Sequence, residues 1–84
     1  MTEWPDWYSR ELELSTHLLK RMVDRQFDEA DLRLMLEDAL GYHESHEAGR
    51  WVIEARQEGR PWEIIVEPIP DEEVLVVVTA YPVE

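Results

Sequence analysis

Hydrophobic positions in this chain change from a helical spacing to an alternating spacing near residue 50. Between residues 18 and 40 they recur every three or four positions, as on one face of an amphipathic helix. Between residues 51 and 67 they alternate with polar positions, as on half-buried strands. The pattern predicts an α+β fold of two layers, in which a short N-terminal strand and two helices precede a three-stranded antiparallel β-meander.

Both predicted helices have a recognisable start. Ser15 is the expected N-cap of the first helix, with Leu14 and Leu19 as a hydrophobic staple. Asp28 is the expected N-cap of the second helix, which we predict to end at Gly41 in the C′ position. The residues expected to be buried are Leu18, Leu19, Met22 and Val23 in the first helix and Leu32, Met35, Leu36, Ala39 and Leu40 in the second.

Residues 1–84 are predicted to form a single domain, with an aromatic extension at 1–10 and a core at 11–82. Three aromatic side chains, Trp4, Trp7 and Tyr8, are too many for a solvated tail, so we expect them to dock on the domain or on a partner. The alternation of residues 11–14 predicts a short strand. One long helix through Arg25 is the alternative, and the N-cap at Ser15 favours the strand.

Three strands are predicted in the second half, at Trp51–Arg56, Trp62–Glu67 and Glu73–Tyr81, after a polar loop at Tyr42–Gly49. The last strand is apolar on both faces, and such strands are normally buried on both. The helices can cover one face. The other is expected to be covered by the N-terminal aromatics or by a second chain, as in a homodimer, or to form a binding surface.

The net charge of −12 limits the partners of this protein. An acidic surface repels polyanions, so we expect no DNA partner, and RNA would need a local basic patch. A basic protein is a natural partner. Cysteine is absent and no apolar run is long enough to span a membrane, which fits a cytoplasmic protein. Asparagine is also absent, and depletion of thermolabile residues is typical of thermophile proteins, although GC-rich coding would give the same composition.

Three cationic or ionisable side chains, His17, Arg21 and Arg25, lie four residues apart and share one helix stripe. Like charges at this spacing cost about 0.2–0.5 kcal/mol per pair, so an anion should face them. An imidazole beside two guanidiniums could act as general base on an RNA 2′-hydroxyl while the arginines hold the phosphate. The structural alternative pairs the arginines with carboxylates of the sheet, at Glu54, Glu63 or Glu67.

Other candidate chemistry is weaker. His43 and His46 could bind a metal, but they fall in a predicted loop and lack an evident third ligand. Glu54, Glu63 and Glu67 share a strand face and are expected to be solvated. We therefore predict no metal and no cofactor.

Several motifs resemble a family of small bacterial proteins catalogued as a domain of unknown function. They are Ser15-Thr16-His17, Arg21-Met22 with Arg25, Phe27–Leu32, Gly49-Arg50-Trp51, Gly59-Arg60-Pro61 and Thr79-Ala80-Tyr81-Pro82. That family is distantly similar to BrnT and RelE, the RNA-cleaving toxins of bacterial toxin–antitoxin pairs. The resemblance implies a RelE/BrnT-like fold with catalytic residues at His17, Arg21, Arg25, Arg50 and Tyr81.

Two functions therefore follow from the sequence. The first is a toxin-like, metal-independent ribonuclease that acts on RNA or the ribosome and has an antitoxin partner. The second is a non-catalytic acidic interaction module, homodimeric or bound to a basic protein. The ribonuclease requires His17, Arg21 and Arg25 to converge in a concavity. The module requires an apolar surface elsewhere.

Overall fold

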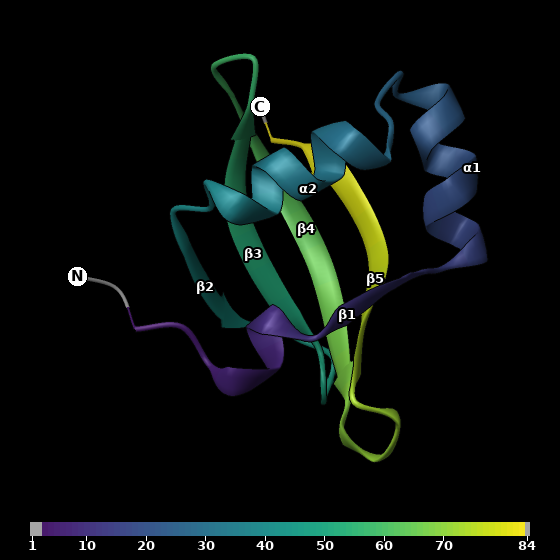
Figure 1. Ribbon diagram of the computed structural model, residues 1–84. Coiled ribbons are helices and arrows are strands. Elements are labelled where there is room, and N and C mark those ends of the chain that lie inside the picture. Colours follow the sequence, from purple (N-terminus) through teal and green to yellow (C-terminus); the bar gives the residue numbers. More distant parts are fainter. Residues whose placement is uncertain (1–2, 84) are drawn as a thin grey trace.

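The computed structural model describes residues 3–83, which form two α-helices and a five-stranded sheet (Figure 1). The helices are α1 (Thr16–Asp24) and α2 (Glu29–Glu37), and the strands are β1 (Glu11–Leu14), β2 (Gly41–Glu44), β3 (Trp51–Gln57), β4 (Arg60–Ile69) and β5 (Val74–Pro82). The predicted α+β class is confirmed, as is the short strand before the first helix. The alternative of one long helix through Arg25 is wrong.

The sheet is larger than the predicted meander. Its order is β1-β5-β4-β3-β2, with β1 parallel to β5 and the other neighbours antiparallel. The predicted polar loop at Tyr42–Gly49 is wrong in its first part, because β2 pairs with β3 along residues 41–44. The sheet is therefore mixed.

Both helix starts are confirmed. The Ser15 side chain accepts from the backbone N–H of Leu18 at 3.0 Å, and Asp28 forms a reciprocal capping box with Asp31. The predicted end of the second helix is wrong: α2 stops at Glu37, and Gly41 belongs to β2.

One face of the sheet and the two helices enclose the core (Figure 1). α2 lies across β3, and α1 stands beside β5. Leu18 and Leu32 are fully buried between the layers. The buried apolar residues of the sheet in this core are Ile53, Ala55, Trp62, Ile64, Val66, Leu75, Val77 and Ala80. Three residues predicted to be buried are instead exposed, at 50% for Leu19, 79% for Val23 and 56% for Leu40.

The N-terminal aromatic residues pack on the same layer as the helices. Trp4 stacks on Tyr8 with ring centroids 4.3 Å apart, and Trp7 lies 5.5 Å from Trp51 of β3. The Tyr8 hydroxyl donates to the backbone carbonyl of Leu36 in α2. This docking confirms that the extension is not a solvated tail, and it leaves the opposite face of the sheet uncovered by these residues.

The start and end of α1 protect the outer edge of β5 beyond the short strand β1. The backbone N–H of Ser15 donates to the carbonyl of Val77, and the Ser15 hydroxyl donates to that of Val78 at 2.6 Å. At the other end of the helix, the Arg25 guanidinium donates to the carbonyl of Ala80 at 2.7 Å. Unpaired backbone groups at a strand edge can pair with another chain and cause aggregation. The bonds from Ser15 and Arg25 satisfy the carbonyls of β5 and so protect this edge.

Candidate functional site

The structure places the predicted catalytic side chains of α1 in different surroundings. His17 is exposed in the first turn. Arg21 forms an ion pair with Asp24 of the same helix at 3.1 Å, while Arg25 bonds to a backbone carbonyl of β5. Neither arginine has the sheet carboxylate that the structural alternative predicted. Arg25 lines a cleft at the end of α1, whereas His17 and Arg21 do not line it.

The remaining predicted site residues lie on the sheet. Arg50 donates to Glu67 of β4 at 3.0 Å and to Glu47 at 2.9 Å. The Tyr81 hydroxyl donates to Glu63 at 2.7 Å, across the β4–β5 pair. Both side chains are thus bonded to carboxylates. The structure brings Tyr81 and Arg50 to sheet carboxylates rather than to the cationic side chains of α1.

The hydrogen bond to Glu63 raises the pKa of Tyr81 to about 12, with burial and the carboxylate charge adding to the shift. The folded state therefore stabilises the neutral phenol of Tyr81 relative to the unfolded state, in which this side chain has its ordinary pKa near 10. The stabilisation is fully present below pH 10 and is lost as the pH rises through about 12. We expect the ultraviolet phenolate titration attributable to Tyr81, taken as the difference from Tyr81→Phe, to occur near pH 12.

Glu63→Gln is the matched variant for this titration, since it removes the charge but keeps an acceptor oxygen. It should lower the pKa of Tyr81 toward the ordinary value. A Tyr81 titration that is the same in wild type and in Glu63→Gln would contradict the assigned cause.

The histidine pair does not form a metal site in the described part of the chain. His43 lies on β2, with its Nδ1 atom 3.5 Å from a carboxylate oxygen of Glu54, and His46 is exposed in the following turn. Among residues 3–83, no cluster of three or more His, Asp or Glu side chains could hold a metal ion.

The second face of the sheet is the open face, which we define by the outward side chains of β1, β3, β4 and β5. Its central row joins Val52, Ile65 and Thr79 in register, and Val76 lies in the next row. Val52 is buried, and the other three are half-buried. The carboxylates of the open face are Glu11, Glu13, Glu54, Glu63 and Glu67. Arg56 of β3 shares this face with Glu54, and Arg50 is bonded to Glu67. An apolar centre with a rim of net negative charge therefore occupies the face that the helices leave free.

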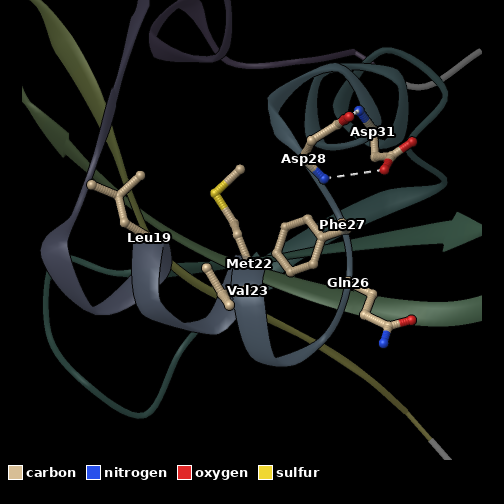
Figure 2. Close-up of a pocket in the computed structure, with 7 residues that line it drawn as sticks. All are labelled: Leu19, Met22, Val23, Gln26, Phe27, Asp28 and Asp31. Carbon is tan, nitrogen blue, oxygen red and sulfur yellow. Dashed lines mark hydrogen bonds between the residues drawn. The ribbon is translucent and has the colours of Figure 1, made fainter.

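The helical layer carries a separate apolar groove of about 540 Å³ between α1 and α2 (Figure 2). Leu19, Met22 and Val23 of α1 line it together with Phe27. On the side of the groove formed by α2, the Asp31 carboxylate accepts a hydrogen bond from the backbone N–H of Asp28 at 3.1 Å. The helical spacing of these apolar residues of α1 predicts a buried face, so the sequence pattern does not indicate the groove.

A narrower cleft of about 360 Å³ adjoins this groove beside the β3–β4 turn. Arg25 and Arg60 both line it, with Gln57 at the end of β3. Arg60 was not among the predicted site residues. No spacing signal links it to Arg25, because the two residues meet only through the fold.

Taken together, these features define a small α+β domain whose open sheet face and helical layer are both accessible. Residues 14–82 match the model of a protein family described as a domain of unknown function, DUF4258. The chain belongs to this family, which confirms the predicted membership of a family of unknown function. Comparison with curated proteins gave no match, and neither did comparison with solved structures. Among the described residues, no helix is long and apolar enough to cross a membrane.

Proposed function

We propose that this protein is a non-catalytic interaction module that binds a basic partner protein through its open face. The observation that supports this function is the composition of that face. Ile65, Thr79 and Val76 form a half-buried apolar centre, and carboxylates surround it. Protein interfaces commonly combine an apolar centre with a polar rim.

The charge favours a basic partner over a second copy of the chain. Each copy carries a net charge of −12, and pairing two open faces would bring their carboxylates together. Like charges that face each other across an interface cost several kcal/mol. A basic protein gains attraction from the same carboxylates, and its association would be accelerated at low ionic strength.

Val76→Lys tests the surface directly. Val76 is flanked in register by Glu67 of β4 and Glu13 of β1, so the sheet can accommodate a lysine while the apolar centre is lost. Leu34→Lys is the matched control, since it makes the same change in charge at a side chain of α2 that is 56% exposed. Circular dichroism is used to check that both variants fold.

We expect the wild type to sediment as a monomer and to retain basic proteins from a cell extract, identified by mass spectrometry. Val76→Lys should reduce the retention of these proteins at least about tenfold, equivalent to 1.4 kcal/mol, and Leu34→Lys should not. Equal retention by both variants would contradict the assigned surface. A dimer that Val76→Lys dissociates would replace the basic partner with a second copy.

The second candidate is the toxin-like ribonuclease with a RelE/BrnT-like layout. It is supported by the exposure of His17, one helical turn before Arg21 on α1. The test is incubation with a mixed RNA pool at low salt, with and without EDTA. Cleavage that persists in EDTA and disappears in His17→Ala would favour the ribonuclease. Equal behaviour of wild type and His17→Ala would exclude His17 as its general base.

A further inference from the structure

The groove between α1 and α2 has the form of a docking site for apolar side chains. Val23 is 79% exposed and Leu19 is 50% exposed, although both line the same groove as the buried Phe27. Figure 2 shows these side chains and Met22 arranged along one wall. Grooves of this kind accept apolar side chains of partner segments because their burial removes water from both surfaces.

The adjoining cleft contains two guanidinium groups, the less common charged group in this acidic protein. Arg25 and Arg60 line it, and within residues 3–83 neither forms an ion pair with any of the carboxylates described. The bond to the carbonyl of Ala80 fixes Arg25 in place and leaves its other N–H groups free of described partners. Gln57 adds an amide to the same cleft. These groups are suited to bind an oxyanion, for which arginine has matching donor geometry.

The groove and the cleft are neighbours that share lining residues. Gln26, Phe27 and Asp31 line both of them. Two residues of the cleft, Gln26 and Glu58, have left-handed backbone angles, with φ of 55° and 53°. Residues other than glycine or asparagine are uncommon in the left-handed region. The turns at Gln26 and Glu58 therefore hold strained backbone conformations.

We propose that the groove and the cleft together bind the C-terminal tail of a partner protein. Apolar side chains of the tail occupy the groove beside Leu19 and Val23, and the terminal carboxylate lies between Arg25 and Arg60. The ionised side chains that line the cleft are these two arginines with Asp31 and Glu58, so their formal charges cancel. Because neither arginine is ion-paired with a described carboxylate, their N–H groups can donate to one carboxylate of the tail. The many phosphates of RNA would instead be repelled by the surrounding net charge of −12.

The test compares three pools of soluble peptides with four randomised apolar residues at the C-terminus. Peptides of the first pool end in a free C-terminal carboxylate, and those of the second pool end in a C-terminal amide. Peptides of the third pool carry one additional C-terminal aspartate and also end in an amide, so that their only added carboxylate is that of the aspartate side chain. Immobilised protein should retain the free-acid pool about tenfold more than the amide pool, as expected for a charge-assisted bond worth about 1.4 kcal/mol. Retention of the third pool at the level of the first would show that a side-chain carboxylate serves equally and would overturn the terminal assignment.

Arg60→Gln should abolish the preference for the free acid, and Val23→Asp should abolish retention of all three pools. Arg60 is exposed and outside the β5 edge contacts, so its variant is expected to fold even if an Arg25 variant does not. Arg56→Gln is the matched control because Arg56 is an exposed arginine of β3 that does not line the cleft. Equal retention of acid and amide pools by the wild type, or no retention of either, would overturn the proposal. Val23 and Arg60 lie outside the open face, so failure of their variants here is separable from failure of the proposed function.

Discussion

Leu36→Ala is expected to lower the free energy of unfolding by about 2–5 kcal/mol, the cost usual for removing a large aliphatic side chain from a core. Leu36 is 8% exposed and belongs to the core cluster between α2 and the sheet. Its truncation leaves a cavity that neighbouring side chains can fill only in part. Urea denaturation followed by circular dichroism measures the change.

Leu34→Ala is the matched control for this experiment, because it makes the same truncation two residues earlier in α2. Leu34 is 56% exposed, so the change should fall near the small values typical of surface positions. If both variants lost the same stability, the register of α2 against the sheet would be wrong. The pair therefore tests the periodicity that predicted this helix.

Local signals account for the parts of the fold that the sequence predicted. The start of α2 was predictable because Asp28 and the residues that follow form a capping box before an apolar periodic segment. The strands β3 and β4 were predictable because alternation is a strong signal where one face is buried.

The missed elements depend on tertiary contacts. Residues 41–44 show no alternation, and they form β2 because β3 offers a backbone edge with which they pair. The backbone N–H of Leu40 donates to the carbonyl of Glu54 at 2.7 Å, so the chain has already turned toward the sheet where continuation of α2 was predicted. In β5, an irregularity opposite Ile65 and Val66 changes which residues face the core.

The candidate surfaces were predictable to different degrees. The apolar character of β5 on both faces indicated a surface in need of a partner, and the structure leaves that face open. The stripe of His17, Arg21 and Arg25 was visible as a spacing, but spacing does not reveal that Arg25 bonds to β5. The cleft between Arg25 and Arg60 joins residues 35 positions apart, which no local pattern could connect.

Ser15→Ala is expected to lower the free energy of unfolding by about 1.5–5 kcal/mol, because this hydroxyl makes two bonds at once. It accepts from the N–H of Leu18 as the N-cap, a role worth about 0.5–2 kcal/mol. It also donates to the carbonyl of Val78, and an acceptor left without a partner costs about 1–3 kcal/mol. The measurement is again chemical denaturation of purified wild type and variant.

Two further substitutions separate the bonds. Ser15→Thr keeps a hydroxyl that can accept and donate, so most of the stability should return. Ser15→Asp keeps the cap acceptor but cannot donate to Val78, and its stability should fall between those of the other two variants. If Ser15→Asp matched wild type, the bond to β5 would contribute nothing. If stability instead rises from Ser15→Ala through Ser15→Asp to Ser15→Thr, the Ser15 hydroxyl joins α1 to the sheet. An effect of Ser15 on stability can then be distinguished from any role of His17 two residues later.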